Sequence, residues 1–172
     1  MGDTTPGLRR TYFNIAKQTA EGIDFEFRQR SNLGQWGQLV STLGGTYNLH
    51  YKFAAAPGQP LDEYIGTYYY PRWRANATFD WERGPWLATV FVNYIHHYYQ
   101  ANQVVHTYVD SWTGTDFQLQ YKGFKNWTLG LGVKNLFDRD PPFSDDETQG
   151  YDFTTHNPVG RFYYGRVKYA FK

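Results

Sequence analysis

The feature that most constrains the fold is a regular alternation of apolar and polar residues along seven long segments. In the first segment, for example, Ile23, Phe25 and Phe27 alternate with charged residues. A two-residue period is that of a β-strand with one apolar and one polar face. The seven segments cover residues 23–28, 38–53, 72–82, 86–99, 116–122, 127–134 and 163–171. A tilted strand needs about 9 to 11 residues to cross a bilayer, and most of the segments reach this length. Strands of soluble proteins usually have about 5 or 6 residues.

The polar positions of these segments carry charges of both signs. Charged residues are tolerated toward the lumen of a barrel, whereas a Lys or Arg at mid-depth on the lipid face costs about 2–4 kcal/mol. The fourth segment is less regular, because Phe91 and Ile95 share the parity of Thr89 and Asn93. The charged residues expected to face the lumen are Asp24, Glu26, Arg28, Arg72, Arg74, Asp80, Glu82, Asp116, Lys122, Lys134, Arg166 and Lys168.

The connections between the segments alternate in length. Short turns are expected near residues 31–34, 83–85 and 122–126, and long loops near residues 54–66, 100–110 and 138–158. Outer-membrane barrels have short periplasmic turns and long extracellular loops. The sequence therefore predicts an all-β fold, with about seven or eight long antiparallel transmembrane strands that form part of a larger β-barrel.

Aromatic residues make up 20% of the chain although its mean hydropathy is −0.68, a combination that fits alternating strands with aromatic belts at the two membrane interfaces. The filling of an ordinary core is the alternative. One group of tryptophans flanks the short turns: Trp36, Trp81, Trp86 and Trp127. A second aromatic group flanks the long loops: Tyr68, Tyr69, Tyr70, Trp73, Tyr98, Tyr99 and Trp112.

Several classes of protein are disfavoured by the composition. A net charge of +1 argues against a nucleic-acid groove, and the lack of cysteine removes disulfide scaffolds and thiolate metal sites. No apolar run approaches the about 20 residues of a membrane helix. The N-terminal residues do not resemble a signal peptide, so we expect either a chain cut from a larger precursor or a protein outside the membrane.

The C-terminal part of the chain resembles TonB-dependent receptors. The run Asn135-Leu136-Phe137-Asp138 is similar to the end of the family's penultimate strand. The run from Gly160-Arg161 to the aromatic Phe171 resembles its last strand, although Lys172 follows the aromatic. Upstream, Gly22-Ile23-Asp24 is similar to a further strand of the family, with Asp in place of the usual Glu.

The resemblance implies a 22-stranded barrel with an N-terminal plug that contacts TonB. Residues 1–172 would then be the C-terminal part of the barrel, with the plug domain and signal peptide absent. The implied function is import of a scarce nutrient, such as a siderophore, a cobalamin or an oligosaccharide. The implied partners are outer-membrane lipid, the TonB complex through the plug, and the barrel-assembly machinery through the strand that ends at Phe171.

No catalytic constellation is present, so we expect no enzymatic activity, no cofactor and no metal site. His96 and His97 are adjacent on a predicted strand and should point to opposite faces. Residues 145–147 are acidic, and a solvated loop is expected there rather than a Ca²⁺ site. Residues 138–140 are interpreted as a structural ion cluster and turn. Six aromatic residues could stack on a ligand, although a place in the interfacial belt is the simpler interpretation: Tyr68, Tyr69, Tyr70, Tyr98, Tyr99 and Trp112.

Two other architectures stay open. Residues 4–19 could supply an eighth strand that pairs with the strand ending at Phe171, which would close a small structural or adhesive barrel. A soluble, aromatic-rich β-sandwich or lipocalin-like binder would show a similar composition.

Overall fold

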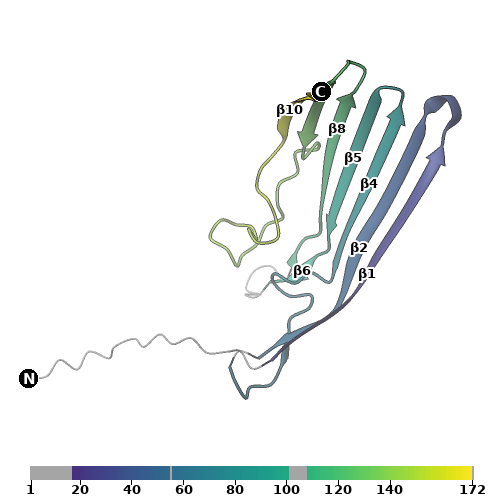
Figure 1. Cartoon of the computed structure of the whole chain (residues 1–172). Helices are drawn as coiled ribbons and strands as arrows, with labels where there is room; N and C mark the ends of the chain where they lie inside the picture. Colours follow the sequence, from purple (N-terminus) through teal and green to yellow (C-terminus); the bar gives the residue numbers. More distant parts are fainter. Residues whose placement is uncertain (1–16, 55, 101–107, 172) are drawn as a thin grey trace, which may run out of the picture.

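The computed structural model describes residues 17–54, 56–100 and 108–171, and these residues form one large antiparallel sheet (Figure 1). Its seven long strands follow one another in the order β1-β2-β4-β5-β8-β9-β10, so each pairs with its neighbour along the chain. Their bounds are β1 Gln18–Asn32, β2 Gln38–Phe53, β4 Trp73–Arg83, β5 Trp86–Ile95, β8 Trp112–Tyr121, β9 Trp127–Lys134 and β10 Phe162–Tyr169. The predicted all-β fold with seven long strands is confirmed.

The remaining elements are short and lie at the ends of the sheet. β3 (Asp62–Glu63) pairs with the C-terminal end of β2. β6 (Tyr98–Tyr99) pairs with β7 (Tyr108–Val109) in the connection between β5 and β8. A single 3-10 turn, η1 (Gly34–Trp36), connects β1 and β2. Within the described part of the chain, no helix has the length and hydropathy needed to cross a membrane.

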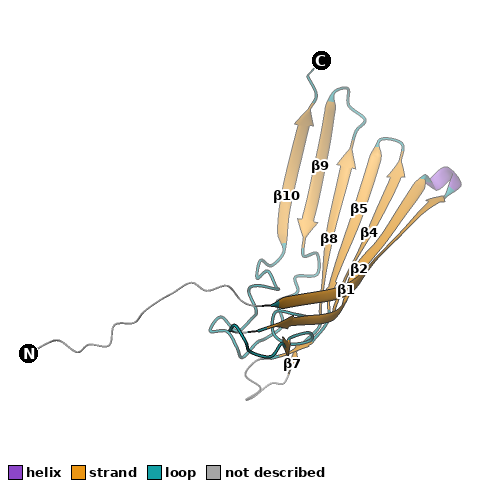
Figure 2. Cartoon of the chain, turned by 60° about the horizontal axis from the view of Figure 1, so that its bottom comes forward, coloured by secondary structure: helices purple, strands orange, loops and turns teal. Residues whose placement is uncertain are grey.

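The sheet is open, because β1 and β10 do not pair with each other in the described residues (Figure 2). No second sheet of comparable size covers either face of it there, so the β-sandwich alternative is wrong. The eighth strand considered for residues 4–19 falls, up to residue 16, outside the described residues. What is described is a partial barrel wall rather than a closed small barrel.

The strand register sorts the alternating residues onto two faces. Residues paired directly across an antiparallel sheet lie on the same face, and the pairs Leu119↔Leu131 and Leu129↔Val167 place large apolar residues side by side. This apolar face has no protein cover: Leu131 is 70% exposed. The opposite, polar face carries the charged positions, among them Asp80 on β4.

A register shift in the β1–β2 pair moves the end of β2 to the other face. Ile23 pairs with Tyr47, but beyond the shift Ala20 pairs with Tyr51. Because β1 alternates without interruption, Tyr47 and Tyr51 lie on opposite faces of the sheet. The parity of the sequence, which assigned one apolar face through Phe53, is therefore wrong beyond Leu49.

Short turns and long loops gather at opposite ends of the sheet (Figure 1). The turns are residues 33–37, 84–85 and 122–126, and the long loops are residues 54–72, 96–111 and 135–161, here called the first, second and third long loops. The two-residue turn after β4 requires Gly84, whose φ of 55° lies in the left-handed region. The predicted sorting of the connections is confirmed.

Aromatic rings line the apolar face near both of its ends. At the turn end, the rings of Trp86 and Tyr121 lie 4.7 Å apart, as do those of Trp127 and Tyr169. At the loop end, the ring of Trp73 lies 4.7 Å from that of Tyr47. Amphipathic rings at these two heights are typical of the two interfaces of a bilayer.

Candidate functional site: the loop core and the rim

The first two long loops meet in a small buried cluster at the end of the sheet. Tyr68 from the first loop packs with Ile95 at the end of β5, Tyr98 in β6 and Val109 in β7, and Trp112 at the start of β8 packs against them. Tyr98 is 1% exposed and Val109 is 0% exposed. We call these five residues the loop core. They hold the first and second loops against the mouth of the sheet.

Polar contacts attach the third loop to the loop core. The Tyr98 hydroxyl donates to Oδ2 of Asp152 at 2.7 Å, and the Tyr68 hydroxyl donates to Oε1 of Glu147 at 2.6 Å. Oε1 of Gln100 accepts the backbone N–H of Asp145 at 2.6 Å. Each contact joins the third loop to a residue more than forty positions earlier, so the loops are packed as one unit.

Burial raises the pKa of both Tyr68 and Tyr98 above the ordinary value for tyrosine, and the neighbouring carboxylates Glu147 and Asp152 raise it further. Both phenols therefore stay protonated and act as hydrogen-bond donors. For Asp152, desolvation favours the neutral form, but the hydrogen bonds from Thr154, Tyr98 and Thr155 outweigh it and lower the pKa of the carboxyl group. A charged acceptor faces a neutral donor, which is a strong form of hydrogen bond.

The six predicted ligand contacts divide into two groups in the structure. Tyr68, Tyr98 and Trp112 lie together in the loop core, packed against protein rather than at a membrane interface, which corrects the interpretation of these three as belt residues. Tyr69 and Tyr99 are about two-fifths exposed. Contact of any of the six with a ligand stays a prediction.

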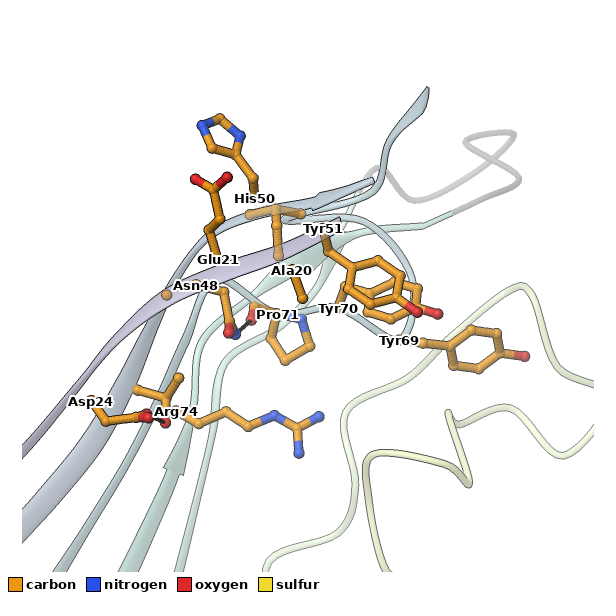
Figure 3. Close-up of a pocket in the computed structure, with 13 residues that line it drawn as sticks. Ala20, Glu21, Asp24, Asn48, His50, Tyr51, Tyr69, Tyr70, Pro71 and Arg74 are labelled. Atoms are coloured by element: carbon orange, nitrogen blue, oxygen red, sulfur yellow. Dashed lines mark hydrogen bonds between the residues drawn. The ribbon is translucent and has the colours of Figure 1, made fainter. Parts of the chain in front are cut away.

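Tyr70 and Tyr51 form a stacked pair at the rim, with ring centroids 4.2 Å apart and an interplanar angle of 21°. They line a pocket of about 390 Å³ together with Tyr69, Asn48 and Arg74 (Figure 3). Figure 3 shows Tyr51 on the side of the sheet where Arg74 lies, while His50 points the other way. The sequence reasoning missed Tyr51, because only the register shift brings its ring to this side.

A second pocket of about 420 Å³ lies on the polar face, between β5, β8, β9 and the end of the third loop. Phe91 lines it together with Asp116, Lys134 and Asn135. The irregular parity of the fourth segment therefore has a physical reason. Phe91 faces this pocket, and Ile95 faces the loop core.

The motif around Asn135 forms a clasp between the last two strands. The side chain of Asn135 bonds both backbone groups of Arg139: it accepts a hydrogen bond from the N–H at 2.9 Å and donates one to the C=O at 3.0 Å. Oδ1 of Asp138 accepts the backbone N–H of Arg161 at 2.6 Å, just before β10 begins. Asn135 and Asp138 both have positive φ, which these residue types tolerate best after glycine. Asn135 thus shapes the turn after β9, and Asp138 fixes where the last strand starts.

Several expectations about individual residues are corrected. The rings of His96 and His97 lie 4.0 Å apart instead of on opposite faces, because β5 ends at Ile95 and regular alternation stops there. Within the described residues, positions 138–140 form a hydrogen-bonded turn and no ion pair among themselves. The guanidinium of Arg72 lies 5.9 Å from the centre of the Tyr47 ring, on the apolar side, and not toward the lumen.

The acidic loop is also more ordered than expected, because Glu147 accepts bonds from two tyrosines, Tyr68 and Tyr69. No group of three potential metal ligands was found among the residues that the structure describes. The sequence carried no signal for Gln100, Asp152 or His156, which lie in loops without periodicity and are buried only through long-range contacts.

Comparison with known proteins gives evidence that is independent of these contacts. The family model described as TonB dependent receptor-like, beta-barrel matches residues 1–136, a range that ends inside the 135–138 motif. No curated protein sequence matches the chain.

Two similar solved structures are variants of the ferric enterobactin receptor of Pseudomonas aeruginosa, the second in complex with enterobactin. Each is 20% identical to this chain, with TM-scores of 0.58 and 0.63. Each alignment covers 92% of this chain but only 23% of the receptor, so the chain spans about a quarter of those proteins. At this identity the likeness shows the fold. The family model, which matches well over half of the chain, describes a receptor barrel and no enzyme: the chain belongs to the TonB-dependent receptor-like β-barrel family.

Proposed function

We propose that this chain forms part of the wall of an outer-membrane receptor of a Gram-negative bacterium, which imports a scarce nutrient. The observation that carries the proposal is the two-faced sheet: a continuous apolar face bounded by aromatic belts, opposite a polar face with charges of both signs. A contiguous apolar surface that runs across several strands is unfavourable in water. In a bilayer it meets lipid chains, and the polar face meets the lumen.

The open edges of the described sheet support the same proposal. Unpaired backbone groups cannot be left in the hydrocarbon of a bilayer, so β1 and β10 need further strands beside them. In the proposed receptor those strands belong to the rest of a larger barrel, and a plug domain fills its lumen. TonB acts on that plug to drive import.

We favour a ferric siderophore as the nutrient, because the similar solved structures are named ferric enterobactin receptors. The rim offers aromatic rings from Tyr51, Tyr69 and Tyr70 beside the cation of Arg74. Flat aromatic chelating groups stack on such rings, and the guanidinium group attracts negative charge. A cobalamin and an oligosaccharide are the competing nutrient classes.

The test measures uptake by cells that depend on the receptor carrying these residues. Cells without other iron-chelate receptors are offered radio-iron bound to a catecholate siderophore, labelled cobalamin or a labelled oligosaccharide, with and without TonB. We expect TonB-dependent uptake of the iron chelate alone. TonB-dependent uptake of cobalamin or of the oligosaccharide instead would overturn the proposed substrate class. The absence of any TonB-dependent uptake would overturn the proposed function.

Two exposed tyrosines among the predicted ligand contacts, Tyr69 and Tyr99, are here called the rim tyrosines, and their variants test these contacts. Loss of one stacked ring removes about 0.5–1.5 kcal/mol, so Tyr69→Ala and Tyr99→Ala should each weaken chelate binding by about 2- to 12-fold. Tyr163→Ala is the matched control, because Tyr163 is an exposed tyrosine that pairs with Val133 on the apolar face. Equal effects in all three variants would exclude a ligand role for the rim tyrosines.

We propose that the barrel-assembly machinery recognises the last strand. Phe171 is 88% exposed and packs edge-on against Tyr169 at the turn end of the sheet. We expect Phe171→Ala to reduce the amount of assembled receptor in the outer membrane without changing chelate affinity per assembled molecule. A normal amount of assembled Phe171→Ala receptor would contradict this role.

A further inference from the structure

His156 is the least expected residue of the loop region. It is 5% exposed, and neither of its ring nitrogens has a hydrogen-bond partner in the structure. Its ring is parallel to that of Tyr98, with centroids 6.4 Å apart and an interplanar angle of 13°, and it meets Trp112 edge-on at 5.9 Å. The imidazole therefore contributes as a flat, neutral ring within the aromatic packing of the loop core.

The groups around His156 cannot accommodate its charged form. The titratable and charged neighbours are Tyr98 from β6, Arg74 from β4 and Asp152 from its own loop. Tyr98 is a neutral donor already bonded to Asp152, and Arg74 repels a second positive charge. Burial lowers the pKa of His156 below its ordinary value, more than the attraction of Asp152 raises it.

Asp152 is bonded by other donors and does not accept a hydrogen bond from the imidazole of His156. Its Oδ1 accepts the backbone N–H and the hydroxyl of Thr154 and the backbone N–H of Thr155, while its Oδ2 accepts the Tyr98 hydroxyl. Each carboxylate oxygen offers about two lone-pair sites, so Oδ1 is saturated, and Oδ2 is held by Tyr98 without bonding either ring nitrogen of His156. A proton on His156 would therefore create a buried charge without a partner, and relief requires the third loop to move.

We propose that His156 is an acid-sensitive latch, which holds the third long loop on the loop core when neutral and releases it when the surrounding medium is acidified. The inference concerns the loops alone and does not rest on the proposed transport. A released loop would uncover the hydroxyls of Tyr68 and Tyr98 and the side chain of Gln100, which now bond the loop. Acid would thus open the mouth of the barrel wall.

The sign of the effect follows from linkage. A histidine whose pKa is lower in the closed state stabilises that state above its ordinary pKa, which is about 6.5, and ceases to do so as the pH falls below it. The ratio of closed to open loop should therefore fall by about fivefold over the first pH unit below 6.5, and by at most about tenfold per unit below that, until the pKa of the closed state is reached.

Amide hydrogen exchange of the whole receptor in lipid vesicles tests the latch. After correction for intrinsic rates, we expect protection of residues 143–156 to fall by up to about fivefold from pH 6.5 to 5.5, with no change in β8 and β9. His156→Phe keeps a ring but cannot be protonated, so its protection should be the same at both pH values. His156→Leu is a second uncharged variant if the Phe variant does not assemble.

Two outcomes would overturn the proposal. One is equal protection of the third loop at both pH values in the unsubstituted receptor. The other is a pH-dependent loss in an assembled uncharged variant that equals the loss in the unsubstituted receptor, which would assign the effect to another group.

Discussion

Replacing Leu131 by arginine places a charge in the middle of the apolar face. Leu131 is 70% exposed and lies four residues from the belt residue Trp127. At about 3.3 Å per residue this is about 13 Å along the strand, roughly half of an apolar band of about 25 Å. An arginine at mid-depth on the lipid face costs about 2–4 kcal/mol, so the ratio of folded to unfolded barrel should fall by about 30- to 700-fold.

The matched control is Gln118→Arg on the neighbouring strand. Gln118 pairs with Gly132 on the polar face, which meets the lumen rather than lipid. We expect a change of less than about 1 kcal/mol, as for ordinary surface substitutions. The measurement is the urea midpoint of the receptor in lipid vesicles, supported by the amount of protease-resistant barrel in outer membranes. Equal midpoints for the two variants, or a lower one for Gln118→Arg, would refute the assignment of the faces.

Three further predictions concern local contacts. Gly132→Ala should lower the urea midpoint, because the added Cβ would overlap the Tyr164 ring. Gly130→Ala is the control and should not lower it, because the nearest atom to its added Cβ would be 3.6 Å away. Equal midpoints for the two variants would contradict the packing. Asn135→Ala should destabilise the turn after β9 by about 1–3 kcal/mol, because two bonds to the backbone of Arg139 are lost. Asn135→Gly, which tolerates the positive φ, should cost less; the reverse order would contradict the clasp. For Glu63, desolvation is outweighed by bonds from the Tyr51 N–H, the His50 ring and the Ile65 N–H, which lower the pKa from 4.5 to about 2. The protection of the Tyr51 amide should therefore persist at neutral pH and be lost from about pH 4.5 down to about 2, and a Glu63→Gln variant that retained this pH dependence would contradict the assignment.

The sequence predicted the sheet well because its signal is periodic. Each apolar residue such as Leu129 has to alternate with a polar one for as long as the strand crosses lipid, and this pattern survives without knowledge of the partners. The short turns were equally predictable, because Gly84-Pro85 between two alternating segments is a turn signal. The two faces were therefore predicted correctly over most of the sheet.

The loop end could not be predicted, because no period governs it. Tyr98 and Asp152 are brought together across fifty-four positions by packing that leaves no local trace. A one-residue bulge was enough to reverse the face of Tyr51. Composition alone places Tyr68 in an interfacial belt, whereas the packing of the loops makes it a buried hydroxyl donor.

The central claim is that β8 crosses a bilayer with one face in lipid and the other in water. The chain has no cysteine, so single cysteines introduced from Phe117 to Tyr121 can each carry a spin label without background. In lipid vesicles, collisions with oxygen should dominate at positions 117, 119 and 121, and collisions with a water-soluble nickel complex at positions 118 and 120. A scan without this two-residue alternation, or with the opposite phase, would contradict the account.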